Sequence, residues 1–546
     1  MAIETPYSKI HALIIDDMAV QQTTLRGQLA MLGISRVDQA VTAEDAIRHL
    51  RSGKHGLVLC DFNLNHKTDG QQLFEHLREN ELLPADCLFF MVTAENAYNS
   101  VASASEHKPD AYLVKPITAS DVEERLKAAM ERRKAFLAVN MALTKKDLPA
   151  ALAACETLLA AKDRWFIQAL QQKGQLLLQL GRPEDAKAVY QSALSQRPQL
   201  IWAQLGLARA LKAAGLFEEA KQVATEIVQS QDGERNGAAY DVLAEALEAQ
   251  GDTQAAQWIL RDAAMIVPSA KRQRLLADSA FRNGDLPVVL DALNKVAKAT
   301  KGSMAALPQD TLALAQALVD AGRPAESLAL LDQPRSKLSA NTAQHESVAL
   351  AIRAQALVRS GDLDGALQAV ARARENLRGA KADFATVALA KAELVTGHEE
   401  SGLRLLGAAV SSDHENPRVK QLVRNALRDT GHEEKMDHLV ESAAAGLQSR
   451  LSEAKTLFRN SQIDDALKAI EGALKEYPDN TSVLLQAAQM NCLSLRLKKQ
   501  LNAAVVDRVR LYLARLDKLM PTSDRVAHMQ RYFRETLAAL AEPATA

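Results

Sequence analysis

Five residues in the N-terminal part of the chain have the types that phosphoryl transfer to a carboxylate requires. They are Asp16, Asp17, Asp61, Thr93 and Lys115, and each follows a short apolar run. Three carboxylates gathered at one place would repel one another unless a hard divalent cation were bound, and Mg²⁺ is the natural occupant. The Asp61 carboxylate could then attack a phosphoryl group, while the Lys115 ammonium and the Thr93 hydroxyl stabilise its oxygens.

The elements that must position these residues alternate along the chain. Apolar runs at 12–15, 36–41, 57–60, 87–92 and 112–114 predict strands, and helical patterns fall near 19–32, 43–52, 70–82, 96–107 and 118–130. This alternation predicts an α/β domain with a five-stranded parallel sheet covered on both faces. Ligands of such sheets bind beyond the carboxyl ends of the strands, where the five residues lie. No glycine-rich phosphate loop occurs, so a nucleotide is not expected as the direct phosphoryl donor.

The order of these residues resembles the CheY-like receiver domain of bacterial two-component response regulators. The steps Asp16-Asp17, Asp61, Thr93-Ala94 and Lys115-Pro116 match the acidic pair, the phosphoacceptor, the threonine and the lysine-proline of that family. The resemblance implies a flavodoxin-like domain over residues 1–128, with a cis Lys115-Pro116 peptide bond. It also implies a histidine kinase or phosphotransfer protein as the phosphoryl donor.

The same resemblance assigns roles to further residues. Mg²⁺ would be held by the carboxylates of Asp16, Asp17 and Asp61 and by the backbone carbonyl of Asn63. Tyr112 would be the aromatic switch residue, whose ring turns inward when the threonine moves toward the phosphate. An ordinary half-buried strand aromatic is the alternative interpretation of Tyr112.

The loop after the acceptor departs from the family pattern. The segment 61–70 is one residue longer than the common form and lacks the methionine-proline that often follows the acceptor. We therefore expect an altered loop that retains the chemistry. His66 and Lys67 are candidates for effects on partner choice or phosphate lifetime, although a solvated loop histidine is the simpler interpretation of His66.

The rest of the chain repeats one pattern with a period near 34 residues. Aromatic residues make up only 4% of the sequence while alanine and leucine dominate this part, which favours closely packed helices. A small residue usually stands seven positions before each turn signal, and Pro198, Pro268 and Pro478 each follow a turn by seventeen positions. The turn signals fall at Lys146, Gly181, Gly215, Gly251, Gly284, Gly322, Gly361, Gly397, Gly431 and Ser461.

These columns resemble the tetratricopeptide repeat, a helical hairpin that stacks into a solenoid. About ten such hairpins are expected over residues 129–500, followed by capping helices in 501–541 and a disordered tail at 542–546. The polar stretch 333–344 predicts a loop or bend in one unit. Another solenoid of helical pairs is the alternative.

Five side chains on first helices are candidates for contacts in a binding groove, because first helices line the groove in the tetratricopeptide family. They are Gln171, Gln175, Trp202, Arg209 and Lys212. Packing is the alternative role for Trp202, and solvated helix surface is the alternative for the two glutamines.

The two parts are joined without a glycine-serine linker. Ser120 is expected to cap a helix that continues through residues 131–143 into the first repeat. We expect a stiff connection that transmits a change in the receiver to the repeats.

Charge and motif content exclude several functional classes. Residues 1–119 carry a net charge of −5 and the remainder +4, which is not the balance of a nucleic-acid binder. The four cysteines lack ligand-like spacing, so disulfide frameworks and zinc sites are poorly supported. No stretch is long and apolar enough to insert into a membrane. No second catalytic constellation accompanies the receiver pocket, so we expect a cytoplasmic protein that is not an enzyme.

The sequence thus predicts a phosphorylation-dependent response regulator whose output is protein binding, with Mg²⁺ as cofactor and a homodimer as one possible assembly. The alternative is a phosphate-independent scaffold with a vestigial receiver. A third hypothesis, an enzyme regulator or phosphatase, is disfavoured because the chain has no second reactive site.

Overall fold

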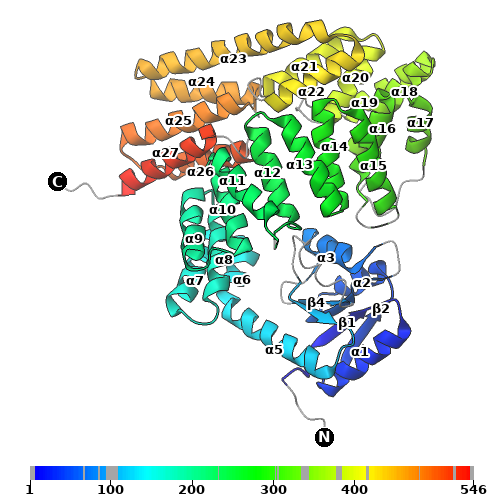
Figure 1. Cartoon of the computed structure of the whole chain (residues 1–546). Coiled ribbons are helices and arrows are strands. Elements are labelled where there is room, and N and C mark those ends of the chain that lie inside the picture. The colour runs from blue at the N-terminus through cyan, green and yellow to red at the C-terminus, as the bar shows by residue number, and fades with distance from the viewer. Residues whose placement is uncertain are drawn as a thin grey trace, which may run out of the picture.

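The computed structural model combines a small α/β unit with a long array of helices (Figure 1). It describes residues 6–541 except 65–67, 81, 84–86, 94–108, 232, 302, 304–305, 334–342, 377–383, 413–416, 479 and 520–523. The predicted fold class, a five-stranded α/β domain followed by an all-helical solenoid, is confirmed. The predicted helix near 96–107 and the tail at 542–546 lie outside the described residues.

The sheet of the α/β unit is entirely parallel, and its strand order is β2-β1-β3-β4-β5. The strands are β1 (His11–Ile15), β2 (Arg36–Ala40), β3 (Leu57–Asp61), β4 (Leu88–Thr93) and β5 (Ala111–Val114). All five were predicted within one or two residues. Because every strand runs in the same direction, the residues that follow β1, β3, β4 and β5 meet at one edge of the sheet.

Helices cover both faces of this sheet. The core on one face joins α2 (Ala43–Leu50) and α3 (Gly70–Glu79) to strand residues such as Leu13, whereas the other joins α1 (Ala19–Met31) and α5 (Ala119–Ala135) to residues such as Ile14. Successive strand side chains point to opposite faces, so strands buried on both sides read as the continuous apolar runs of the sequence.

The solenoid begins with eight pairs of helices. They are α6 (Leu137–Thr144) with α7 (Leu148–Ala161), α8 (Phe166–Gln179) with α9 (Pro183–Gln196), α10 (Ile201–Ala213) with α11 (Phe217–Gln229), α12 (Gly237–Ala249) with α13 (Thr253–Ile266), α14 (Ala270–Asn283) with α15 (Leu286–Thr300), α16 (Pro308–Asp320) with α17 (Pro324–Leu331), α18 (Ala343–Arg359) with α19 (Leu363–Asn376), and α20 (Phe384–Val395) with α21 (Glu399–Ser412).

The turns within the repeats share one backbone conformation. All ten predicted turn positions have positive φ, including the two that are not glycine, Lys146 (φ 58°) and Ser461 (φ 61°). A residue in the left-handed region ends the first helix and turns the chain into the second, and glycine adopts that region without a steric penalty. The repeat period therefore has a backbone cause.

Small residues allow the second repeat to pack around one tyrosine. Tyr190 is 2% exposed, and its ring lies between α8 and α10 at Gly174 and Gly206. A Cβ atom at Gly174 would lie 2.5 Å from Tyr190 Cζ, and one at Gly206 would lie 2.2 Å from Tyr190 Cε1. Trp202 meets the Tyr190 ring edge-on, with centroids 6.3 Å apart. The glycines of this unit thus make room for its largest core side chain.

Two later units depart from a regular hairpin. Helix α17 has only eight residues and ends just before the predicted interruption, most of which lies outside the described residues. The ninth unit keeps its predicted turn at Gly431 but has no separate second helix: after α22 (Pro417–Thr430) and a short 3-10 turn, α23 runs unbroken over Met436–Arg459 and packs mainly against α21 and α24 (Ile463–Glu476). This segment contains no proline, so the second helix of one unit continues into the first helix of the next.

The junction between the two parts is a kinked pair of helices. Helix α5 ends at Ala135, Phe136 departs from helical geometry, and α6 begins at Leu137. Phe136 is buried and meets the Trp165 ring edge-on at 6.4 Å, which fixes the kink. The absence of a flexible linker is therefore confirmed, but the single continuous helix is not.

The cap of α5 also differs from the prediction. Thr118 rather than Ser120 begins the helix, because the Thr118 hydroxyl accepts a hydrogen bond from the Asp121 backbone N–H at 3.3 Å. The Asp121 carboxylate in turn accepts one from the Thr118 N–H at 2.8 Å, which forms a capping box. Thr118, two residues before Ser120, thus accepts a hydrogen bond from one of the backbone N–H groups at the start of the helix.

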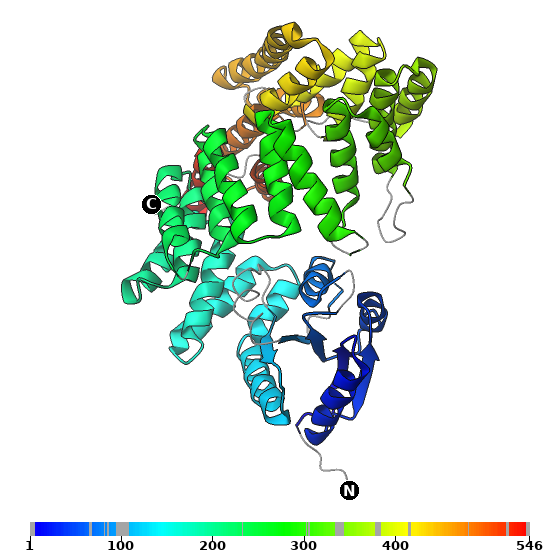
Figure 2. The same cartoon turned by 45° about the vertical axis from the view of Figure 1, so that its right-hand side comes forward.

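The array returns upon itself at its C-terminal end. After α25 (Thr481–Lys498) come the two predicted capping helices, α26 (Ala503–Leu519) and α27 (Asp524–Ala541). Arg534 on α27 donates a hydrogen bond to the carbonyl of Gly181, in the α8–α9 turn, at 3.3 Å. Farther along, Asn425 on α22 donates to the carbonyl of Phe281 on α14 at 3.3 Å. Figures 1 and 2 show the last helices lying beside α8 to α11.

Candidate phosphoryl-acceptor site

The three predicted acidic residues meet at the carboxyl edge of the sheet. Asp16 and Asp17 follow β1, Asp61 ends β3, and carboxylate oxygens of all three lie within 4.8 Å of one another. Asp16 is fully buried and Asp61 is 8% exposed. Burial at such spacing is costly unless positive charge compensates the carboxylates.

Lys115 supplies part of that charge. It follows β5, and its Nζ lies 2.8 Å from Asp61 Oδ2 and 3.5 Å from Asp16 Oδ2. Its side chain is 27% exposed, so Lys115 contacts the two buried carboxylates while staying partly accessible to solvent. The peptide bond from Lys115 to Pro116 is cis, as predicted.

Asp16 has the properties of a ligand for a hard cation. Its Oδ1 accepts a hydrogen bond from the Met18 N–H at 2.8 Å, whereas its buried Oδ2 accepts no hydrogen bond from any described residue. Burial raises the pKa of Asp16 and the charges of Asp61 and Asp17 raise it further, although the Met18 N–H and Lys115 oppose this shift. An oxygen that is buried, faces other carboxylates and has only the Lys115 ammonium nearby, at 3.5 Å, fits a divalent ion such as Mg²⁺.

Gly70 holds the acceptor loop close to the strand, a role that the sequence analysis did not assign. The Phe62 N–H donates to Val92 O, and the Gly70 N–H returns the loop to Phe62 O, each at 2.8 Å. A Cβ atom at Gly70 would lie 2.1 Å from the backbone oxygen of Asp61, so no larger residue fits there. A glycine as the first residue of α3 was the only local signal.

The other predicted receiver residues lie around this pocket, and their roles remain predictions. Thr93 is buried at the end of β4, next to β3, and its carbonyl accepts a hydrogen bond from the Lys115 N–H at 2.8 Å. Tyr112 is half-buried on β5 and packs against the core beneath α2 and α3. Asn63 is exposed two residues after Asp61. His66 and Lys67 lie outside the described residues.

Removal of the Lys115 ammonium is expected to slow phosphorylation while leaving the acidic cluster able to bind a cation. We expect Lys115→Met to lower the rate of phosphate incorporation about 10²- to 10³-fold, because this is the usual cost of losing one preorganised stabilising group. The measurement is a time course with acetyl phosphate and Mg²⁺. Lys9→Met is the matched control on an exposed lysine, and an unchanged rate in Lys115→Met would show that the ammonium does not contact the transferring group.

The predicted groove residues are not equivalent in the structure. Gln175 and Arg209 are exposed, whereas Gln171 is half-buried. Lys212 pairs with Glu245 of the next repeat, and the contact of Trp202 with Tyr190 is a packing contact. Gln175 and Arg209 are exposed and so are accessible to a partner. The assignment of all five residues to a binding groove remains a prediction.

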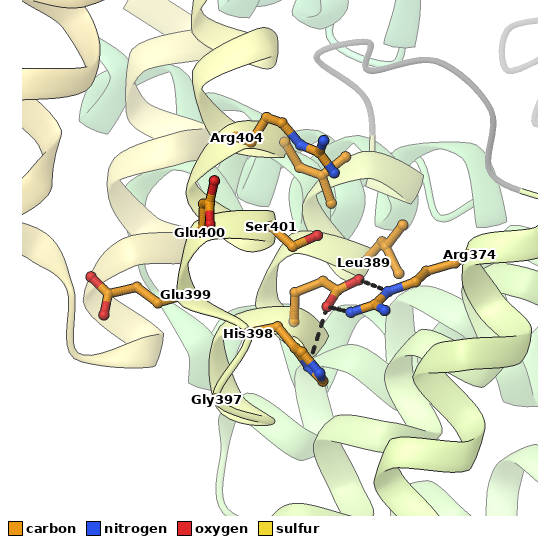
Figure 3. Close-up of a pocket in the computed structure, with 10 residues that line it drawn as sticks. Arg374, Leu389, Gly397, His398, Glu399, Glu400, Ser401 and Arg404 are labelled. Atoms are coloured by element: carbon orange, nitrogen blue, oxygen red, sulfur yellow. Dashed lines mark hydrogen bonds and ion pairs between the residues drawn. The ribbon is translucent and has the colours of Figure 1, made fainter.

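A separate pocket of about 670 Å³ lies in the solenoid, between α19, α20 and α21 (Figure 3). Arg374 forms an ion pair with Glu393 at its wall, and His398 Nδ1 lies 3.5 Å from Glu393 Oε2. Figure 3 also shows Arg404 at the rim. The pocket mixes acidic and basic groups, lies far along the chain from the acidic cluster of the receiver, and contains no nucleophile paired with a base.

Comparison with known proteins identifies the class of each part. Residues 12–127 match the response regulator receiver domain, and residues 177–240, 311–333 and 347–372 match the tetratricopeptide repeat. The chain therefore carries a receiver domain at its N-terminus, followed by tetratricopeptide repeats.

Curated proteins similar to part of the chain include chemotaxis proteins. Chemotaxis protein CheY-3 of Vibrio cholerae is 28% identical over 120 residues, which are 22% of this chain and 91% of that protein. Chemotaxis protein CheY of Pseudomonas aeruginosa is 29% identical over 120 residues, which are 22% of this chain and 95% of that protein. Each of these two matches covers about a fifth of this chain and nearly the whole of the relative.

Two of the solved structures similar to part of the chain are the following. One is a MamA RS-1 ArsTM double mutant, with 19% identity and a TM-score of 0.26 over 30% of this chain and 91% of that one. The other is a tetratricopeptide repeat protein from Parabacteroides merdae, with 14% identity and a TM-score of 0.30 over 48% of this chain and 98% of that one.

Within the part of the chain that the structure describes, no helix combines the length and the apolar character needed to cross a bilayer.

Proposed function

We propose that this chain is a phosphorylation-dependent response regulator with a protein-binding output. Asp61 accepts the phosphoryl group, and Asp16, Asp17, Asp61 and the backbone carbonyl of Asn63 hold Mg²⁺. The observation that carries the proposal is the contact of Lys115 Nζ with Asp61 Oδ2 at 2.8 Å within a cluster of three carboxylates. Such a carboxylate is held beside the positive charge that its phosphorylated form requires.

The donor is a phosphohistidine of a histidine kinase or phosphotransfer protein. An Asp61 carboxylate oxygen forms the new bond to phosphorus as the bond from phosphorus to the histidine nitrogen breaks, and the released imidazole takes up a proton from solvent. Bound Mg²⁺ would supply positive charge to the phosphoryl oxygens. Lys115 neutralises the same oxygens from the β5 side, the Thr93 hydroxyl donates a hydrogen bond to one of them, and Tyr112 reports the movement of Thr93.

Two connections can carry the change from the acceptor to the repeats. The first is the kinked α5–α6 junction at Phe136. The second joins the start of α3 to the loop between α15 and α16, where Ser303 donates a hydrogen bond to Gln72 Oε1 at 3.0 Å and accepts one from Thr68 at 3.4 Å. Since Gly70 ties the start of α3 to the backbone of Asp61, a shift of the acceptor loop would alter this second contact.

The output is binding of a protein or peptide by the solenoid, and the chain acts without catalysing a reaction on that partner. Tetratricopeptide arrays offer extended surfaces for such ligands. The pocket between α19 and α21, with Arg374, Glu393, His398 and Arg404, offers charges of both signs to a peptide. The cytoplasm is the compartment in which a kinase-coupled receiver of this kind would act.

The direct test combines labelling with capture. The full chain is incubated with acetyl phosphate and Mg²⁺, separated on a phosphate-affinity gel, and used in parallel as bait against a cell extract. A shifted band that disappears with EDTA, together with a bound protein whose recovery depends on the label, would support the proposal. A chain that stays unmodified while a control receiver is labelled would instead favour a phosphate-independent scaffold.

A flexible insertion at the junction is expected to uncouple the two parts. We expect a six-residue glycine-serine insertion after Phe136 to leave phosphorylation intact and to reduce the phosphate dependence of partner capture at least several-fold, because it breaks the α5–α6 connection. The same insertion after Ala541 is the matched control. Capture that keeps its full phosphate dependence would rule out transmission through the junction.

A further inference from the structure

A second cluster of metal-ligating side chains lies on the receiver, at the edge formed by β1 and β2. His11 begins β1, Asp38 lies in β2, His49 lies in the last turn of α2, and His55 precedes β3. Strand pairing sets Leu13 opposite Asp38, two residues beyond His11 on the same face of the sheet, which α2 covers. Figure 1 shows α2 and β2 together on one side of the receiver.

Three imidazole rings converge on one oxygen of this cluster. Asp38 Oδ2 lies 2.9 Å from His55 Nε2, 3.1 Å from His11 Nε2 and 3.6 Å from His49 Nδ1. Two of these distances are hydrogen-bond lengths and use the two lone pairs of Asp38 Oδ2, whereas His49 Nδ1 at 3.6 Å lies just beyond hydrogen-bond reach. In a tetrahedral site with ligands at about 2.0–2.1 Å from the ion, neighbouring ligand atoms lie about 3.3 Å apart, a value within the range of these three distances.

The burial of the four side chains suits a site that an ion can enter. The His55 side chain is only 1% exposed and anchors the cluster, while the side chains of His11, Asp38 and His49 are 23%, 37% and 39% exposed. The His11 and His55 rings lie 4.4 Å apart, a separation that suits neutral imidazoles, the form that binds metals. Two imidazolium ions at that distance would repel each other.

The chemistry of the donors selects the class of metal. Imidazole nitrogen with carboxylate oxygen suits Zn²⁺ and related divalent transition metals, whereas Mg²⁺ prefers oxygen ligands alone. The cluster is also separate from the acceptor, because His11 and Asp16 lie five residues apart along β1, about 16 Å at the usual rise of a strand.

We propose that His11, Asp38 and His55, whose ligand atoms all lie within 4.8 Å of one another, hold Zn²⁺, and that His49, 3.6 Å from Asp38, completes a tetrahedral site as the fourth ligand. Four protein ligands close the coordination sphere, which is the pattern of a structural rather than a catalytic site. The ion would tie α2 and the segment before β3 to the outer edge of the sheet. This site stands apart from the proposed phosphorylation, since it uses none of the acceptor residues.

The test is a titration of the full, tag-free chain with Zn²⁺ alone, after EDTA treatment and in a Mg²⁺ background that occupies the acidic cluster. We expect one Zn²⁺ per chain by calorimetry. We also expect Co²⁺ in its place to give the intense visible absorption of a tetrahedral ion. His49→Gln and His11→Gln should each weaken Zn²⁺ binding at least about 100-fold, since even outer partners of metal ligands are worth about 10- to 100-fold.

Matched variants separate this site from others. His76→Gln, on a histidine of α3 outside the cluster, should keep wild-type affinity, and so should Asp61→Asn. Both His49 and His11 are partly exposed, so their variants should retain the wild-type circular dichroism spectrum. If Zn²⁺ affinity is unchanged in both His49→Gln and His11→Gln, the proposal is overturned and the residues form only a hydrogen-bonded Asp–His cluster. If Zn²⁺ affinity is lost in Asp61→Asn, the ion binds in the acceptor pocket instead. None of these readouts depends on phosphorylation.

Discussion

Asp61→Asn is expected to abolish incorporation of phosphate into the chain. The amide keeps the size of the side chain, but it is not a nucleophile and carries no negative charge for Lys115 or Mg²⁺ to bind. The shift seen for wild type on a phosphate-affinity gel should vanish, and the mass increase of one phosphoryl group should be absent from intact-protein mass spectra.

The matched control for this variant is Asp291→Asn, since the Asp291 side chain is 62% exposed on α15, outside the receiver. It should label at the wild-type rate. The Asp61→Asn chain should also keep its folded circular dichroism spectrum, because the change removes one charge from a repulsive group of carboxylates. Persistent labelling of Asp61→Asn would move the acceptor to another residue and end the assignment.

Tyr190→Ala is expected to be the most destabilising single change in the repeats. It removes a ring that is 2% exposed and fills the space left by Gly174 and Gly206, so the neighbouring glycines cannot expand into the cavity. We expect the free energy of unfolding to fall by about 3–5 kcal/mol, the usual cost of emptying an aromatic core site. Denaturant titration followed by helical circular dichroism measures the change.

Trp258→Ala provides the comparison, because Trp258 is an aromatic residue of the α12–α13 unit and is 57% exposed. Its removal should change the free energy of unfolding by less than about 1 kcal/mol. If Tyr190→Ala behaved like Trp258→Ala, the ring would not be the packing centre of its repeat.

Local chemistry explains what the sequence could predict. Glycines that end first helices need positive φ, so the turn at Gly251 was visible from residue type alone, and the turn at Lys146 from its place in the same period. The acidic cluster was predictable because parallel strands deliver their following residues to one edge, which brings Asp16 to Asp61.

Contacts between distant segments explain what the sequence could not predict. Asp38 and the three histidines around it come from β2, β1, α2 and a loop, with no spacing that marks a metal site, so an argument from cysteine spacing could not find them. The continuous α23 depends on packing against α21 and α24 rather than on any local signal except the lack of proline. The role of Gly70 depends on how closely its backbone approaches Asp61.

The hydrogen bond from Arg534 to Gly181 affects how the helical array would unfold from its C-terminal end. In an open stack each unit depends only on its neighbours, so unravelling can start at a free end and spread. Here α27 is hydrogen-bonded to the turn of the second unit, 353 positions earlier in the chain. Its end of the array is therefore held in place by a distant unit as well as by its neighbours. A partner whose binding required the C-terminal helices to separate from the second unit would have to break this contact, which would make the contact a gate on recognition.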